Sequence, residues 1–366
     1  MENEFNMLMN VEFGDIDGMY DPNLCDYFVD RNYWEELINN NRFYVIGRKG
    51  TGKSALYKWI KLQTMEKGDL CSNMLFNEFP FGQLLNLKDD NFLKPNQYQT
   101  ICRHMILSEF ARLIVNDAEH VVGKEYSDIE YYYKNIVGES IQDCFRESVK
   151  RTTKSEGQLV FKAFAASKGA EEEKNYSFTD NDLTSINNTL ERVIIAYFKS
   201  YPHPKRFLIQ IDGIDENYTQ IACEQNALDD YFHFIICLMK ATYTFNQKIH
   251  SECSDIAKCI IYLRSDIFFE IHKLDAESAR WEQNAFFLNW AVGREDSWRN
   301  NDLRKIVNAR ISNSLNELRN VDAFDNLFIP EKINLTVPAG RYRLKNGRTK
   351  PKYKTVDNLF EYLDNM

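Results

Sequence analysis

Two glycines, a lysine and a serine near residue 50 have the spacing of a loop that binds phosphate. The pattern G-x-x-x-x-G-K-[ST] is matched at every position, by Gly47, Gly52, Lys53 and Ser54. In this pattern, glycines let successive backbone N–H groups face phosphate oxygens, and the positive end of the next helix faces the same anion. The lysine would reach the β and γ phosphates, and the serine hydroxyl would hold Mg2+. The residues predicted to bind nucleotide are Gly47, Arg48, Lys49, Gly50, Thr51, Gly52, Lys53, Ser54 and Ala55.

A group of acidic residues follows an apolar run in the segment RFLIQIDGIDEN. Asp212 comes directly after Phe207–Ile211, which we predict to be a strand. Ligands of open α/β sheets bind at the carboxyl ends of strands, so we assign Asp212 to the magnesium ion. Asp215 and Glu216 lie within the next turn, and either could orient or deprotonate the water that attacks the γ phosphate. The alternative for these two is that they are only acidic residues in the first turn of a helix.

Arg264 follows a third apolar run, Cys259–Leu263, which we also predict to be a strand. In ATPases of this plan, the strand beside the aspartate-bearing strand often presents a polar residue to the γ phosphate. Arg264 could have that role, or Asp266 could simply begin a helix there. The predicted catalytic residues are Lys53, Asp215, Glu216 and Arg264, and the predicted metal ligands are Ser54 and Asp212.

The segments on either side of the glycine-rich loop predict a strand and a helix. Phe43–Ile46 is a short apolar run with aromatic and β-branched residues, which is typical of a buried parallel strand. After the loop, Leu56, Trp59 and Ile60 recur at the spacing of a helix that packs on a sheet. The sequence therefore predicts an α/β fold with a parallel-sheet core of the P-loop NTPase type.

The segment FGDIDGMYDPNLCDYFVDRNYWEELINNNRFYVIGRKGTGKSAL resembles a family of bacterial P-loop ATPases with a GRKGTGKSA signature. The segment IQIDGIDE at Ile209–Glu216 is similar to the STAND branch of AAA+-like ATPases, which includes the NACHT type. The resemblance covers residues 12–60 closely and 205–310 more loosely. It implies an ATP-dependent switch or motor subunit, often in bacterial defence or regulatory gene neighbourhoods, with ATP and Mg2+ as cofactors.

The two motifs lie far apart, which predicts an insertion between them. We expect residues 1–41 to form an N-terminal segment and a helix that flank the nucleotide site. Residues 42–90 and 200–290 would form the ATPase core, and residues 91–199 a long, mostly helical insertion. Residues 291–366 would form a small C-terminal helical region that could contain a winged helix.

A run of seven basic residues with no acid lies between residues 341 and 354, in a chain whose net charge is −9. The acidic balance of the chain argues against nucleic-acid binding by the whole surface. The run contains Asn346-Gly347, a strong two-residue hairpin turn. A basic hairpin there could contact DNA or RNA phosphates, and the alternatives are a solvated hairpin or one that docks on an acidic partner.

The remaining features predict a cytoplasmic protein with no membrane segment. The eight cysteines include no CxxC pair, so we expect reduced thiols and no metal cluster. A protein partner, either an effector or a second copy, is expected of a switch. Two other functions stay open: a scaffold that holds ATP with little turnover, and a small-molecule kinase.

Overall fold

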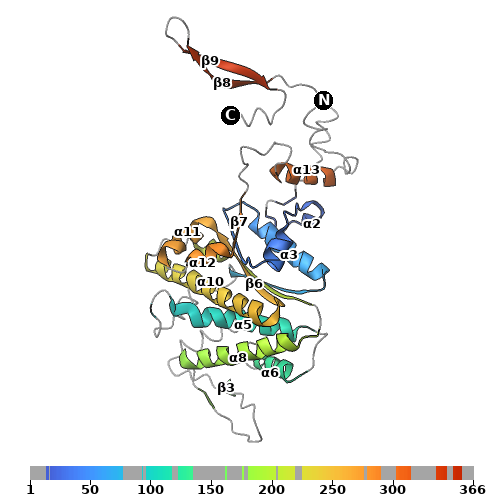
Figure 1. Ribbon diagram of the computed structural model, residues 1–366, viewed down its shortest axis with the longest axis vertical. Helices are drawn as coiled ribbons and strands as arrows, with labels where there is room; N and C mark the ends of the chain where they lie inside the picture. Colours follow the sequence, from blue (N-terminus) through green and yellow to red (C-terminus); the bar gives the residue numbers. More distant parts are fainter. Residues whose placement is uncertain are drawn as a thin grey trace. The chain divides into compact units, whose positions relative to one another are not determined.

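The computed structural model describes residues 14–15, 17–76, 93, 96–117, 123–134, 161–162, 175–176, 180–202, 205–218, 225–275, 278–289, 302–314, 335–343 and 349–356. The chain divides into two compact units (Figure 1). One is Asn32–Leu288, and the other combines Met1–Arg31 with Asn289–Met366. All the predicted catalytic, nucleotide-binding and metal-binding residues belong to the first unit.

A five-stranded sheet forms the centre of the first unit. The strand order is β2-β5-β6-β1-β7, and every neighbouring pair is parallel. Every residue of β5 is buried, and in β6 only the last residue is not, which explains why these strands are almost entirely apolar. The strands are β1 (Tyr44–Gly47), β2 (Leu70–Leu75), β5 (Phe207–Asp212), β6 (Ala257–Arg264) and β7 (Ala285–Leu288). This sheet confirms the prediction of a parallel-sheet α/β fold.

Helices of the first unit connect and cover the strands. The predicted helix after the glycine-rich loop is confirmed as α3 (Lys53–Glu66), which buries Leu56, Trp59 and Ile60. A single-turn π-helix, η1 (Glu35–Asn39), precedes β1, and a 3-10 turn, η6 (Ile214–Asn217), follows β5. This unit also contains α10 (Gln225–Cys253), α11 (Ser265–Leu274) and α12 (Ser278–Gln283).

Between β2 and β5, the described residues are mainly helical. A short 3-10 turn, η4 (Asn96–Tyr98), leads into α5 (Gln99–Val115), and α6 (Lys124–Tyr132) and α8 (Asp180–Ser200) follow. Buried side chains join them: His104 Nδ1 lies 2.8 Å from Asn187 Oδ1, and His104 Nε2 lies 3.3 Å from the Tyr132 hydroxyl. The rings of Phe110 and Phe245 stack at 4.4 Å, which packs α5 against α10. A two-residue antiparallel pair, β3 (Phe161–Lys162) and β4 (Asn175–Tyr176), also lies in this segment.

The second unit contains two described helices and a hairpin. Arg31 Nε lies 2.9 Å from Asp302 Oδ2, and the Arg310 guanidinium lies 4.8 Å from the Tyr27 ring centre, so α2 (Leu24–Tyr27) and α13 (Asp302–Ser314) are neighbours. Strands β8 (Leu335–Arg343) and β9 (Thr349–Val356) pair antiparallel. The predicted turn at Asn346-Gly347 lies outside the described residues. In the described part of the chain, no helix has both the length and the apolar character that a bilayer span requires.

Candidate functional site

The sheet brings three of the predicted site segments to one edge. Because the strands are parallel, β1 ends at Gly47, β5 at Asp212 and β6 at Arg264 on the same side. Gly47 is level with Arg264 of β6 and with Leu288 of β7. The chain leaves β1 to form strands on one side of it and later forms β7 on the other side. Ligands of open α/β sheets bind at the carboxyl edge where the strand order reverses in this way.

The loop between β1 and α3 needs glycine for two different physical reasons. Gly50 and Gly52 have φ of +82° and +86°, a left-handed conformation that side chains with a Cβ rarely adopt. A Cβ added at either position would meet no atom within 4 Å, so the space beside both is open. A Cβ at Gly47 would instead lie 2.5 Å from Thr51 Oγ1 and 3.2 Å from Leu288 Cβ. Backbone conformation therefore requires glycine at 50 and 52, whereas close packing requires it at 47.

Lys53 is the first residue of α3, and its side chain is folded back under the loop. The Nζ atom donates to the carbonyl oxygens of Gly47, at 3.2 Å, and Arg48, at 3.3 Å. The Thr51 hydroxyl also donates to the Arg48 carbonyl, at 2.8 Å, and so braces the same turn. Lys53 is only 8% exposed, while Arg48 and its neighbour Lys49 are exposed. Ser54 and Ala55 are half-buried in the first turn of α3.

Asp212 is a buried carboxylate at the end of β5. Its Oδ1 accepts a hydrogen bond of 2.8 Å from the backbone N–H of Gly213, whose φ of +76° turns the chain into η6. Burial raises the pKa of Asp212 to about 7; the Gly213 hydrogen bond opposes this shift, and the nearby charge of Asp215 adds to it. The Lys53 charge also opposes the shift. Near neutral pH this carboxyl group is therefore poised between its acid and its anion.

Lys53 and Asp212 both carry a desolvation cost. Burial lowers the pKa of Lys53, and the charges of Asp215 and Asp212 act in the opposite direction without cancelling it. A phosphate group beside Lys53 and a cation beside Asp212 would favour the charged form of each. Buried ionisable groups with opposed shifts at one edge of a sheet are typical of a functional site.

Arg264 lies beside Asp215 at this edge. Its Nε is 3.8 Å from Asp215 Oδ2 and 3.1 Å from Asp266 Oδ1, and its guanidinium lies 5.9 Å from the Tyr218 ring centre. The Asp215 side chain is 17% exposed, whereas Glu216 is an exposed residue of the same turn. The fold therefore brings Asp215 into the group formed by Lys53, Asp212 and Arg264.

Gln210 is a polar residue near the site that we read in the sequence only as an interruption of an apolar strand. It is completely buried in β5, two residues before Asp212, and hydrogen bonds join it to α3, β2 and β6. A buried amide in an otherwise apolar strand must find hydrogen-bond partners. A single glutamine within a run predicted to be a buried strand was therefore the signal in the sequence for a buried polar contact.

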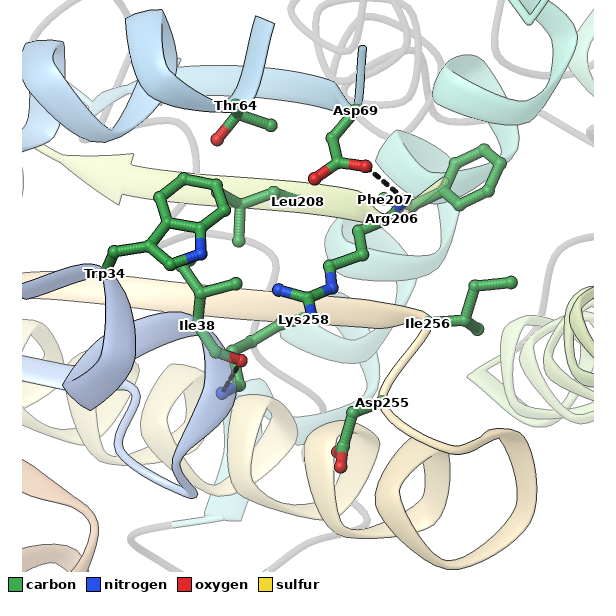
Figure 2. Close-up of a pocket in the computed structure, with 10 residues that line it drawn as sticks. All are labelled: Trp34, Ile38, Thr64, Asp69, Arg206, Phe207, Leu208, Asp255, Ile256 and Lys258. Atoms are coloured by element: carbon green, nitrogen blue, oxygen red, sulfur yellow. Dashed lines mark hydrogen bonds between the residues drawn. The ribbon is translucent and has the colours of Figure 1, made fainter. Parts of the chain in front are cut away.

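A small pocket lies at the opposite, amino-terminal edge of the sheet (Figure 2). Its volume is about 10 Å³, which is about the room that one water needs. Lys258 lines it and donates to three carbonyl oxygens in and beside η1, those of Leu37, Ile38 and Asn40, at 2.9, 3.0 and 2.6 Å. None of the predicted site residues lines this pocket, and two of its basic side chains, Lys258 and Arg206, hold η1 against the sheet.

The groups at the carboxyl edge fit a magnesium nucleotide. The fit rests on two open positive-φ glycines, a buried lysine at a helix start, a half-buried serine beside it, and a buried carboxylate opposite. Within the described ranges, no cluster of three His, Cys, Asp or Glu residues could hold a metal by itself. Mg2+ commonly takes only one or two carboxylates from the protein and completes its shell with phosphate and water.

Comparison with models of protein families, with curated proteins and with solved structures finds no match for this chain.

Proposed function

We propose that this protein binds ATP with Mg2+ at the loop between β1 and α3 and hydrolyses it as a switch or motor subunit. The observation that carries the proposal is the placement of two buried ionisable residues, Lys53 and Asp212, at the edge of the sheet that also carries the positive-φ glycines. The resemblance to bacterial P-loop ATPases supports a place in a defence or regulatory complex. Six free cysteines among the described residues support a reducing, cytoplasmic location.

Each side chain has a distinct task in this proposal. Lys53, released from the two loop carbonyls, would bind the β and γ phosphates, while the Ser54 hydroxyl and Asp212 would hold the metal. The metal would supply charge neutralisation at the phosphates. Asp215, with Glu216 as the alternative, would orient the attacking water, and Arg264 would stabilise charge that develops on the γ phosphate.

Nucleotide binding tests the proposal through the ATP-dependent rise in melting temperature. Mg2+ with excess ATP should raise the melting temperature of the wild type by several degrees, since a ligand at 100 times its Kd stabilises by about 2.7 kcal/mol. Lys53→Met should abolish the rise. Lys258→Met is the matched control, because Lys258 is a second buried lysine, at the far edge of the sheet. This control should have a lower melting temperature than the wild type, but Mg2+ with ATP should still raise it.

If ATP raises the melting temperature of Lys53→Met as much as that of the wild type, the site assignment is wrong. ATP binding without phosphate release would favour the scaffold. Transfer of phosphate to an added metabolite would favour the kinase.

A second proposal concerns the hairpin of β8 and β9, which we propose contacts the phosphates of nucleic acid. The register pairs Tyr342 with Lys350 and Arg341 with Pro351. The pairing thus brings Arg341 and Arg343 of β8 together with Lys350, Lys352 and Lys354 of β9 in one two-stranded ribbon. A two-stranded ribbon rich in basic residues suits a groove between two rows of phosphate.

Binding of labelled duplex DNA, with duplex RNA beside it, tests this second proposal at several salt concentrations. The triple variant Lys350→Gln, Lys352→Gln, Lys354→Gln should weaken DNA binding at least tenfold and make it less dependent on salt. Wild-type protein that binds neither duplex at low salt would overturn the proposal, and preference for RNA would change the partner.

A further inference from the structure

The Gln210 side chain uses its entire amide group inside the core. Its Nε2 donates to the carbonyl oxygen of Tyr57 at 3.0 Å and to Asn73 Oδ1 at 3.1 Å. Its Oε1 accepts from the Tyr262 hydroxyl at 2.5 Å, and Cys71 Sγ lies 3.5 Å from Nε2. A glutamine amide has two N–H donors and one oxygen acceptor, so every group is used. Gln210 is 0% exposed, which makes these contacts a fixed part of the packing.

Two of these contacts, those with Tyr57 and Tyr262, fasten elements that carry residues of the proposed site. Tyr57 lies one turn after Lys53 on α3, and Tyr262 lies two residues before Arg264 on β6. Gln210 itself lies two residues before Asp212 on β5. The rings of Tyr57 and Tyr262 also meet edge to face, with centres 5.3 Å apart. The amide therefore joins the start of the phosphate-side helix to the strand that ends in the metal-side carboxylate.

We infer that Gln210 is a positioning residue, which sets the separation between Ser54 and Asp212 without touching either of them. The inference rests on the proposed function, in which these two side chains are the protein ligands of Mg2+. The ion demands nearly ideal octahedral geometry with ligands at about 2.0–2.1 Å, so a small shift of α3 against β5 would weaken its binding. Residues that orient metal ligands typically change metal affinity about 10–100-fold when they are substituted.

Asn246 provides a matched comparison for a purely structural effect. It is a buried amide on α10, 4% exposed, and its side chain exchanges two 2.8 Å hydrogen bonds with the backbone of Cys259 on β6. These two bonds join a helix to the sheet, as those of Gln210 do, but without involving α3 or β5. Loss of this amide should destabilise the core and leave the separation of Ser54 and Asp212 unchanged.

The experiment measures ATP binding by calorimetry in EDTA and across a Mg2+ titration, with melting temperature as the measure of stability. Gln210→Met keeps the length of the side chain and removes its polar groups. We expect it to raise the Mg2+ concentration for half-maximal enhancement of ATP affinity about tenfold, while ATP affinity in EDTA changes less than threefold. For Asn246→Leu, the Mg2+ midpoint and the ATP affinity in EDTA should both stay within twofold of the wild-type values. Tyr262→Phe removes one hydroxyl and should raise the Mg2+ midpoint about threefold. This variant replaces Gln210→Met in the experiment if Gln210→Met does not fold.

The inference is wrong if Gln210→Met has the same Mg2+ midpoint as the wild type. If Gln210→Met does not fold, the same result for Tyr262→Phe would overturn it. An equal shift in Asn246→Leu would overturn it too, because general destabilisation would then explain the effect. If folded wild-type protein shows no Mg2+-dependent ATP binding, the proposed function fails, and the role of Gln210 fails with it. That outcome is distinguishable from the others because the wild type itself would then show no Mg2+-dependent ATP binding.

Discussion

At the scale of single residues, Asp212 shows how a binding site differs from a core. Its carboxyl group lies at the end of a buried strand, only 6% exposed, and burial is the largest cause of its pKa of about 7. A carboxyl group chosen for stability alone would be exposed or fully paired. The free-energy cost of burying the charged carboxylate is what we expect of a residue whose charge is needed only when a cation is bound.

Asp212→Asn should therefore stabilise the nucleotide-free protein in a pH-dependent way. Folded Asp212 keeps its proton up to pH of about 7, while an unfolded aspartate loses its proton near pH 4. The folded state binds more protons in this window, so wild-type stability falls as pH rises from about 4 to 7. Asparagine keeps the acceptor for Gly213 without a charge. Melting temperatures of the two proteins should be similar at pH 4, and the variant should melt several degrees higher at pH 8.

A lower melting temperature of Asp212→Asn at pH 8 would contradict this account of Asp212. The same variant should also lose Mg2+-dependent ATP binding, because an amide cannot supply the negative charge.

The two acids of η6 should contribute unequally to turnover. Asp215 is near Arg264 and gives the largest opposing charge effect on the pKa of Lys53, whereas Glu216 is exposed. Asp215→Asn should slow phosphate release about 100-fold, the lower end of the usual contribution of a general base, and Glu216→Gln only about threefold. Steady-state phosphate release at saturating ATP measures both. A larger loss of phosphate release in Glu216→Gln than in Asp215→Asn would show that Glu216 orients the attacking water.

At the scale of elements, the ends of α3 offer a matched pair of glycines. Gly52 begins the helix and Gly68 follows it, with φ of +86° and +78°, and a Cβ at either would meet no atom within 4 Å. Alanine at either position should cost about 1–2 kcal/mol for the left-handed backbone. Only Gly52→Ala should also weaken ATP binding, by about tenfold, because only this turn would face the phosphates in the proposed site. Equal ATP affinities in the two variants, measured by calorimetry, would show that the loop does not bind nucleotide.

The sequence predicted the strands of the sheet centre because buried parallel strands are nearly continuous apolar runs. Our predictions at 43–46, 207–211 and 259–263 are confirmed by β1, β5 and β6. We did not predict β7, which has only four residues, AFFL, and whose pairing with β1 depends on the strand order. The proximity of Arg264 to Asp215 likewise follows from β5 and β6 being neighbours, which spacing along the chain does not reveal. The role of Gln210 also needed the helix and strands on either side of it.

At the scale of the whole molecule, the two compact units should unfold as separate steps. Mg2+ with ATP should raise the midpoint of the Asn32–Leu288 step, since every proposed nucleotide contact lies there. Arg310→Ala should lower only the other midpoint, by a few degrees, because Arg310 stacks on Tyr27 within the second unit. Differential scanning calorimetry distinguishes the steps. A single transition that responds equally to ATP and to Arg310→Ala would contradict this division.

The most direct test of the central claim is phosphate release from ATP by the wild type and by Lys53→Ala, each with Mg2+ and with EDTA. We predict steady release by the wild type that needs Mg2+, and a loss of at least about 100-fold in the variant, since Lys53 would contact the transferred phosphate. Equal rates in the two proteins, or no release while ATP is bound, would contradict the claim that this site hydrolyses ATP.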